Sequence, residues 1–591
     1  MLSIRASRAF ECRWAGPLRV VASAVLLVLS QSPFDLGSVA IIALVPWISA
    51  IQRASPLGAA LKGALLGMAF GLVGAHWIFD ALEAQGSHGF RLLFAALIIT
   101  LWAKGFLFAA SAWAVRVCWS RGSSIAFLGP CLVFGLGEFW ISDSPWGLPL
   151  LLLGHSQISN PGVAQLAVSI GVPGISMLLF ALNLSVARVL ASEPGSRRCA
   201  FAIAAFWLVA TIAGPPLAHR FAPDQRSDSR RLLIVQPHIV QAHRREAAYQ
   251  EQILDNIAAE TSRALTASTD SPDAIVWPET LLTIPVSRDD RIGRRLQTYV
   301  DGWRVPVIVG IARAIPRADG GDSNDPPPAA RLGLYRNSAV WWSPVLGPID
   351  FQDKVRAIPI VESSRDLPGG RRWVSSALGL AEGPRVVEAS AAESLKGEFS
   401  LATALCFEIL FPVIVADRRD EQSVAILNLA DDSWVRGEVV DSQLVTAAAF
   451  RAIEARLTTI RVAHGGSSLA IDRFGREIVS VPANQVAHFF VDTWAGPLPS
   501  PREKGAIVGL PLIAGGLAFL GFGARRAPRG SPMWIRTTIH RFRVCCPAVR
   551  RSGITVWPVL YRNRGRSSRS LGRDCEQAAK SGSNRVITGR S

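Results

Sequence analysis

Apolar segments long enough to enter a membrane recur through the first 218 residues, and they restrict the possible folds more than any other feature. A helix that crosses a bilayer needs about 20 mostly apolar residues. We therefore expect a membrane α-helical bundle of about eight transmembrane helices, the first two marginal in length. The expected segments are 17–31, 37–53, 59–79, 91–117, 124–140, 162–190, 200–218 and 505–523.

The first segment could instead be a signal peptide, since three arginines precede it. We reject that alternative because apolar segments continue and no clear cleavage site follows. The loops near 32–36, 80–90 and 141–161 contain no Lys or Arg. Because basic loops stay in the cytoplasm, we expect a cytoplasmic N-terminus and residues 219–504 on the opposite side.

Two charged residues fall within the expected membrane segments. Lys104 and Glu138 are costly in hydrocarbon, so each needs a structural or functional reason. Lys104 could extend its ammonium group to the membrane surface near a helix end. Glu138 lies in GEFWISDSPWGLPLLLLGHSQ, which could be an aromatic belt or a wall where lipid chains enter a site.

The net charge of +17 is concentrated at the C-terminal end, since residues 524–591 hold 16 Lys and Arg but 2 Asp and Glu. The basic character therefore belongs to a tail and gives little support for a nucleic-acid enzyme. We expect a disordered cytoplasmic tail. Contact with anionic lipid, contact with nucleic acid, and readthrough past a natural stop all remain open for it.

Residues 219–504 alternate short β-rich runs with helical ones, which predicts an α/β sandwich built on central sheets. The composition of 318–333 indicates a surface loop. No phosphate-binding, dinucleotide-binding or H-E-x-x-H motif occurs, and no cysteine spacing resembles a zinc site, so we expect neither cofactor nor metal. The expected strands are 231–236, 274–277, 305–311, 337–342, 401–407 and 424–429, with helices near 244–266, 287–301 and 441–457.

Cys406 is the one cysteine between residues 219 and 504. It ends a β run in LATALCFEILFP, and an inert buried thiol is the commonest role for such a residue. Glu279 and Lys354 also follow hydrophobic runs, in AIVWPET and FQDKVRAIPIVE. Taken singly, each is better read as a surface residue. Together on three strand ends they suit thiol acyl chemistry: a desolvated base, an ammonium for the oxyanion and a nucleophile.

The motifs VWPE, DK followed by P and E, CFE–FP and NLADDSW resemble the nitrilase superfamily with its Glu-Lys-Cys triad. With SPFDLGSVAIIALVPWI, GAHWIFD and PWGLPLLLLGHSQ ahead of them, the chain resembles the apolipoprotein N-acyltransferase family over roughly 20–523. The resemblance implies a membrane domain at 1–218 and a periplasmic α-β-β-α catalytic domain at 219–504. It implies an eighth span at 505–523 and no counterpart for the tail at 524–591.

The same resemblance implies roles for individual residues. Glu279 corresponds to the general base, Lys354 to the oxyanion-stabilising lysine and Cys406 to the nucleophile. The chain departs from the family pattern at Phe407, where Tyr is usual, and in AHGGSS around His464. Supporting positions by resemblance are Glu362, Glu408, Asn428, Asp432 and Trp434.

The implied reaction is acyl transfer from a phospholipid to the α-amino group of a diacylglyceryl apolipoprotein, through a thioester on Cys406. The implied setting is the bacterial inner membrane, the implied partners are these two lipid substrates rather than nucleic acid, and we expect a monomer. One alternative is a membrane-tethered carbon–nitrogen hydrolase or amidase, which needs the triad but no lipid-facing bundle. Another is a catalytically inactive membrane paralogue that keeps the fold.

Overall fold

A computed structural model of the chain describes most of residues 2–495. The expected eighth span, the basic tail, the loop at 318–333 and Trp434 lie outside the described residues. The undescribed positions before 496 are 85, 121–122, 194–195, 222–228, 240–246, 284–285, 314–333, 359–361, 363–384, 391, 434 and 436.

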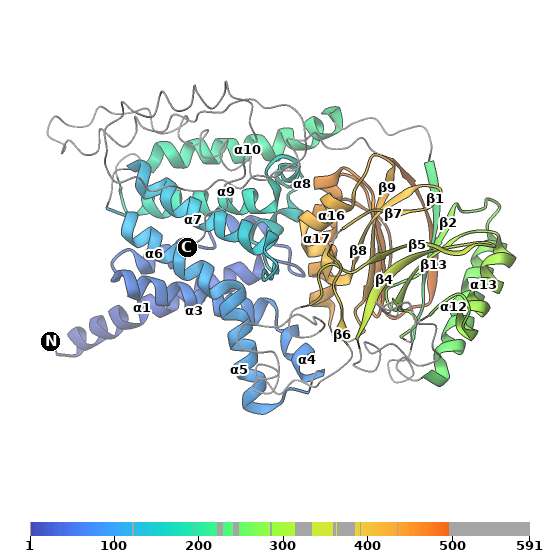
Figure 1. Cartoon of the computed structure of the whole chain (residues 1–591). Coiled ribbons are helices and arrows are strands. Elements are labelled where there is room, and N and C mark those ends of the chain that lie inside the picture. The colour runs from blue at the N-terminus through green and yellow to red at the C-terminus, as the bar shows by residue number, and fades with distance from the viewer. Residues whose placement is uncertain are drawn as a thin grey trace, which may run out of the picture. The chain divides into compact units, whose positions relative to one another are not determined.

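Helices occupy all seven expected segments of the first 218 residues, so the prediction of a membrane α-helical bundle is confirmed (Figure 1). Within the described residues, five are long and apolar enough to cross a bilayer. The first two segments form shorter apolar helices at Ala15–Leu29 and Gly37–Ile51, which agrees with their marginal length in the sequence. The principal elements are α1 (Leu2–Leu29), α2 (Val45–Ile51), α3 (Pro56–Gly74), α4 (Trp77–Ala84), α5 (Gly89–Thr100), η2 (Leu101–Gly105), α6 (Phe106–Cys118), α7 (Ser123–Asp143), η3 (Leu153–Ser159), α8 (Pro161–Ala164), α9 (Ala167–Leu190) and α10 (Ser196–Phe221).

Helix α3 packs very closely against η2 and α6. A Cβ atom added at Gly63 would lie 2.2 Å from the Phe108 carbonyl oxygen, and one at Gly67 would lie 2.6 Å from the Lys104 carbonyl oxygen. Small residues allow this approach, which is how helices associate where lipid removes the hydrophobic driving force. The backbone at Lys104 is a π-helical turn, η2, that joins α5 to α6.

The second half of the chain forms two mixed sheets. The first has the strand order β13-β1-β2-β3-β4-β5, with β6 paired to β4, and the second has the order β12-β11-β10-β9-β8-β7. Strands β1, β2 and β3 run parallel, as do β8, β9 and β10. Strand bounds are β1 (Ser229–Gln236), β2 (Ala274–Val276), β3 (Val307–Arg313), β4 (Leu334–Ser343), β5 (Gly347–Asp353), β6 (Arg385–Val386), β7 (Leu395–Lys396), β8 (Ser400–Leu405), β9 (Ser423–Asp431), β10 (Thr459–His464), β11 (Ser468–Ile471), β12 (Glu477–Val481) and β13 (Ala487–Trp494).

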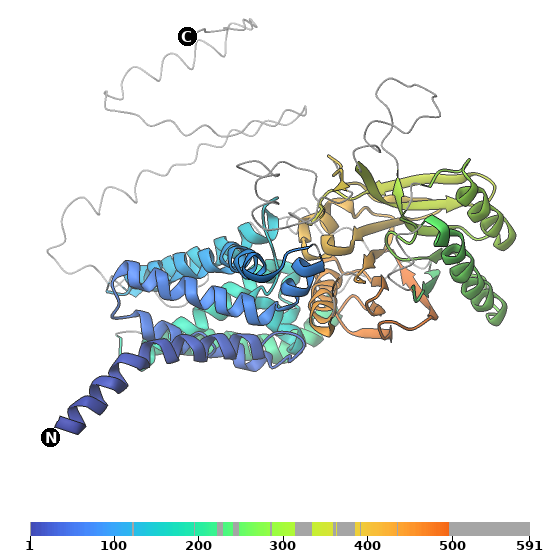
Figure 2. The same ribbon diagram turned by 90° about the horizontal axis from the view of Figure 1, so that it is seen from below.

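The two sheets face each other, and helices cover both outer faces, as Figures 1 and 2 show. One apolar core fills the space between the sheets, with Leu232, Trp341 and Leu427 among its buried residues. A second core joins the outer face of the first sheet to its helices. The expected α-β-β-α sandwich is therefore confirmed. Its helices are α12 (Gln250–Ala267) and α13 (Arg291–Trp303) on one side, and α16 (Pro412–Arg418) and α17 (Glu438–Ala455) on the other.

Helix α17 connects the sandwich to the bundle. It contacts α9 and η3, and one continuous apolar core contains residues of both parts. Polar contacts cross the same junction: the Trp77 indole donates to Gln443 Oε1 at 3.2 Å, and the Val172 amide donates to Glu454 Oε1 at 3.3 Å. The bundle therefore packs directly on the helical layer of the sandwich that contains α17. The domain boundaries expected at 218 and 504 stay predictions.

The close approach of α3 predicts the effect of a single methyl group. Gly67→Ala places a Cβ against the backbone of Lys104, which cannot rotate away, so we expect about 1–3 kcal/mol of destabilisation from overpacking. Thermal unfolding of the full chain in detergent measures it. Gly58→Ala in the same helix is the control, because its nearest neighbour is the Ser55 hydroxyl at 3.0 Å. Equal Tm values for both variants would contradict the close packing.

Candidate functional site

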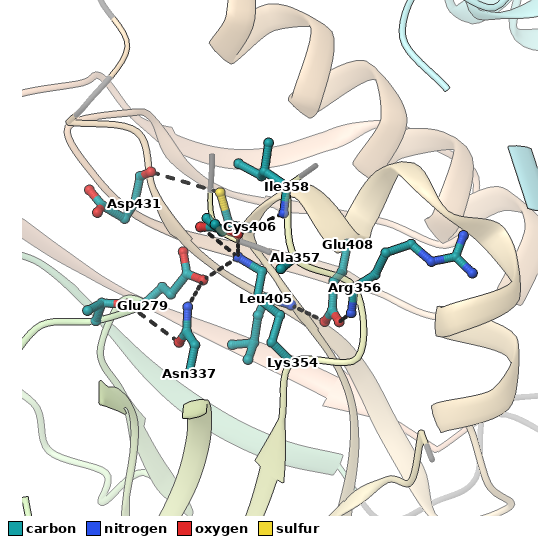
Figure 3. A network of polar contacts seen from close by, with 12 residues as sticks. Glu279, Asn337, Lys354, Arg356, Ala357, Ile358, Leu405, Cys406, Glu408 and Asp431 are labelled. Carbon is teal, nitrogen blue, oxygen red and sulfur yellow. Dashed lines mark hydrogen bonds and ion pairs between the residues drawn. The ribbon is translucent and has the colours of Figure 1, made fainter. Parts of the chain in front are cut away.

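The three candidate catalytic residues follow the carboxyl ends of strands. Glu279 comes after β2, Lys354 directly after β5, and Cys406 directly after β8. All three are buried, with 2%, 0% and 3% of their surface exposed. Strand ends from both sheets therefore bring these side chains together in one buried region (Figure 3).

Lys354 lies between two carboxylates. Its Nζ is 3.1 Å from Glu279 Oε1 and 2.9 Å from Glu362 Oε2. Glu279 Oε1 also accepts a hydrogen bond of 2.7 Å from Asn337 Nδ2, which the dashed lines of Figure 3 show. The ammonium is thereby fixed in position, and Glu279 is held by two donors on the same oxygen.

Cys406 has a strained backbone. Its φ is +49°, in the left-handed region that non-glycine residues rarely adopt. The next residues form a short 3-10 turn, η5 (Cys406–Leu410). Asn428 on β9 stabilises this turn, because its Nδ2 donates to the Ala404 carbonyl at 2.8 Å and to the Cys406 carbonyl at 3.1 Å. The Cys406 Sγ lies 3.9 Å from the Asp431 carbonyl oxygen.

Glu408 connects the cysteine turn to the lysine segment. Its carboxylate accepts hydrogen bonds from the amides of Leu405 (2.9 Å), Val355 (2.7 Å) and Arg356 (3.0 Å). Arg418 on α16 pairs with the same carboxylate at 2.5 Å, and both side chains are fully buried. Glu408 therefore holds the segments that carry Cys406 and Lys354 at a fixed separation.

Arg461 on β10 organises the far side of the cysteine turn. Its Nη1 donates to Asn428 Oδ1 at 2.6 Å, and its Nη2 pairs with Asp432 and lies 3.6 Å from Asp441. Arg461 thereby orients the Asn428 side chain, whose amide group donates to the backbone carbonyls of Ala404 and Cys406.

Burial sets the protonation of the site. Desolvation raises the pKa of Glu279 to about 7, although Lys354 opposes the shift. Burial alone would lower the pKa of Lys354, but Glu279 and Glu362 outweigh it and raise that pKa. Burial and the Glu279 charge raise the pKa of Cys406 well above its ordinary value, and Lys354 only partly offsets them. The Cys406 thiol is therefore neutral near pH 7, close to a carboxyl group that titrates near neutrality.

A cavity of about 100 Å³, partly open to solvent, leads to Cys406. Membrane-bundle residues from α4, α5 and the segment after α7 form one wall, and the sandwich forms the other. The lining is almost entirely apolar, which suits a hydrocarbon chain. The residues lining it are Trp77, Ile78, Ala81, Leu82, Ile99, Leu148, Leu150, Ile358, Cys406, Phe407, Asp432, Val435, Val440, Gln443 and Leu444.

The structure brings Glu279, Lys354 and Glu362 into direct contact, and Asn428 and Glu408 contact the Cys406 turn or its neighbours. Their chemical roles stay predictions, as does that of Trp434. The sequence motifs do not single out Asn337, Arg418 or Arg461. Asn337 and Arg461 are polar residues inside the buried runs NSAVWW (337–342) and TTIRVA (458–463), which was the available signal, whereas Arg418 gave none. Among the described residues, no group of three His, Cys, Asp or Glu could hold a metal ion.

Comparison with known proteins supports this description. Residues 23–185 match the family described as apolipoprotein N-acyltransferase N-terminal domain. The apolipoprotein N-acyltransferase of Brucella melitensis is 27% identical over 524 residues, which cover 83% of this chain and 91% of that protein. That of Azotobacter vinelandii is 26% identical over 557 residues, covering 88% and 97% respectively.

Solved structures align with about half of the chain. An amidase from Nesterenkonia sp. is 14% identical with a TM-score of 0.33, and the alignment covers 49% of this chain and 97% of the amidase. A CN-hydrolase superfamily protein from Xanthomonas campestris is 15% identical with a TM-score of 0.32, covering 45% and 91%.

The fold and the site define a membrane protein whose α-β-β-α domain places Glu279, Lys354 and Cys406 at converging strand ends. Membrane and sandwich signatures occur in one chain. The resemblance to the apolipoprotein N-acyltransferases, predicted from the motifs, is confirmed over most of the length of this bacterial membrane protein.

The buried Glu408–Arg418 pair makes a stability prediction. Glu408→Gln leaves the Arg418 guanidinium buried without its counter-ion, and breaking such a pair costs about 3–5 kcal/mol. We expect a fall in Tm of about 5 °C for the full chain in detergent. Glu398→Gln, on an exposed position of the same domain, is the control and should leave Tm nearly unchanged. A Glu408→Gln protein as stable as the parent would show that the pair does not hold the site together.

Proposed function

We propose that this protein transfers an acyl chain from a membrane phospholipid to the N-terminal S-diacylglyceryl-cysteine of an apolipoprotein, through a thioester on Cys406. The observation that carries the proposal is the apolar cavity that runs from bundle helices α4 and α5 to Cys406. A hydrolase for soluble amides has no need for an opening lined by membrane helices. The names of the relatives support the same substrates.

In the first half-reaction the Cys406 thiol loses its proton to Glu279. The sulfur attacks the ester carbonyl of the phospholipid, the C–O bond breaks, and lysophospholipid leaves with the proton. Lys354 lies next to Glu279 and stabilises the negative oxygen of the tetrahedral intermediate. Because the resting thiol is neutral, proton transfer to Glu279 and attack are coupled.

In the second half-reaction the amine of the acceptor attacks the thioester, and Cys406 leaves as a thiol. The apolar lining favours this amine over water, because it limits hydration of the thioester. Both substrates are held in the membrane, which raises their effective concentration at the site. The setting that fits this chemistry is the outer face of the bacterial inner membrane, with the sandwich in the periplasm and the protein acting as a monomer.

Acyl-enzyme formation tests the proposal directly. Protein in nanodiscs, given phospholipid with a labelled acyl chain, should acquire a hydroxylamine-sensitive label that Cys406→Ala abolishes. Cys118→Ala removes a more exposed thiol and should keep the label. Mass spectrometry of an added diacylglyceryl lipopeptide then follows the N-acylated product. Labelling that persists in Cys406→Ala would exclude this nucleophile. Amide hydrolysis without any label would favour the amidase alternative, and no reaction at all would favour an inactive paralogue.

The raised pKa of Glu279 predicts the pH dependence of the first half-reaction. Glu279 accepts a proton only when ionised, so the kcat/KM for phospholipid should fall as pH drops through about 7. Asn337→Leu removes a 2.7 Å hydrogen bond to the ionised carboxylate. Its loss should raise the pKa and move the midpoint up by about one pH unit.

Thr280→Val is the matched control, because the Thr280 hydroxyl bonds to Asn337 Oδ1 at 3.5 Å rather than to Glu279. Its midpoint should stay near that of the parent. A parent midpoint near 4, or an unshifted Asn337→Leu profile, would show that Glu279 is not the group that titrates.

A further inference from the structure

One charged side chain lines the cavity next to the nucleophile. Among the described residues around this cavity, Asp432 carries the one formal charge, and the rest are apolar or neutral. Its side chain is 6% exposed. A carboxylate in such surroundings costs free energy unless a cation or hydrogen-bond donors compensate it. Its position on the cavity surface therefore calls for a cationic partner.

Arg461 compensates Asp432 only in part. The same guanidinium also lies 3.6 Å from Asp441 and gives its Nη1 to Asn428. One positive charge thus faces two carboxylates, and this cluster remains net negative. Lys354 cannot supply the missing charge, because Glu279 and Glu362 already flank it.

We infer that Asp432 binds the primary ammonium group of the acceptor before the second half-reaction, an assignment that rests on the proposed function. The ammonium loses one proton to become the nucleophilic amine. Its nitrogen then forms the C–N bond as the C–S bond to Cys406 breaks. The nitrogen loses a second proton, which Glu279 relays to the departing sulfur, so the products are the amide, the thiol and one released proton.

An ethanolamine headgroup offers the same chemistry, but the acceptor fits the position better. The acceptor nitrogen must reach the thioester carbon on Cys406, which lines the same cavity as Asp432. A headgroup ammonium is separated from the acyl ester by a phosphate and the glycerol backbone. When the ester carbon lies at Cys406, the headgroup therefore lies several bonds away.

Direct binding tests the inference without turnover. A lipopeptide acceptor and its analogue with a hydroxyl in place of the α-amino group are titrated into Cys406→Ala protein in nanodiscs. We expect the amine to bind about 10–100-fold more tightly, as for a charge-assisted hydrogen bond. C406A/D432N should bind both ligands equally, and C406A/D441N is the control because Asp441 pairs with Arg461 without lining the cavity.

Kinetics on preformed acyl-enzyme give a second readout. Asp432→Asn should raise the KM for the acceptor, and this effect should exceed the change in acyl-enzyme formation at least tenfold. Asp432→Glu, which keeps the charge, should restore part of the loss. Retained preference for the amine in C406A/D432N would overturn the inference, as would an equal effect of the Asp441 control.

The donor lipid distinguishes the two ammonium sources. If Asp432→Asn slows acyl-enzyme formation from phosphatidylethanolamine but not from phosphatidylglycerol, the carboxylate serves the headgroup and the inference is wrong. If the parent forms no acyl-enzyme while still preferring the amine, the proposed reaction fails but the ammonium site stands.

Discussion

The candidate site depends on one buried carboxylate that connects two separate parts of the chain. Glu408 accepts the amides that follow Lys354 and the amide that precedes Cys406, while Arg418 neutralises it. The lysine comes from one sheet and the cysteine from the other. Without a shared acceptor, the distance between them would depend only on apolar packing between the sheets, which is not directional. Hydrogen bonds to a charged group are directional and strong enough to fix it.

Desolvation explains why Cys406 and Glu279 are not both ionised near neutral pH. In water the carboxyl group would be ionised near neutral pH, and a nearby ammonium would favour the thiolate. Burial raises the pKa values of Cys406 and Glu279 together, so the sulfur keeps its proton near neutral pH. A neutral resting thiol is also less reactive toward oxidants than a thiolate. That property suits a lone cysteine expected outside the cytoplasm.

The sequence predicted the parts of the molecule that depend on local pattern. Long apolar runs located the bundle helices, and short buried runs located β1, β3, β8 and β9 within a few residues. Glu279, Lys354 and Cys406 were identified because each lies at or just after a hydrophobic run. Short or partly exposed strands such as β5 and β7 were missed because their burial patterns carry little periodicity. Arg418 was missed because its role comes from tertiary packing. Helix α16 places its guanidinium against Glu408, and no local sequence pattern indicates this pairing.

The left-handed backbone of Cys406 has a consequence for which nucleophiles this scaffold can carry. A β-branched side chain is strained at φ +49°, because its second branch approaches the neighbouring backbone, although Thr280 (φ +44°) and Val345 (φ +66°) adopt the same region elsewhere in this chain. Serine would add no second branch but is a poorer nucleophile than a thiol, whereas threonine would add the strain of that branch. Replacing the thiol by a threonine hydroxyl would therefore add main-chain strain at this position to the weaker reactivity of an alcohol.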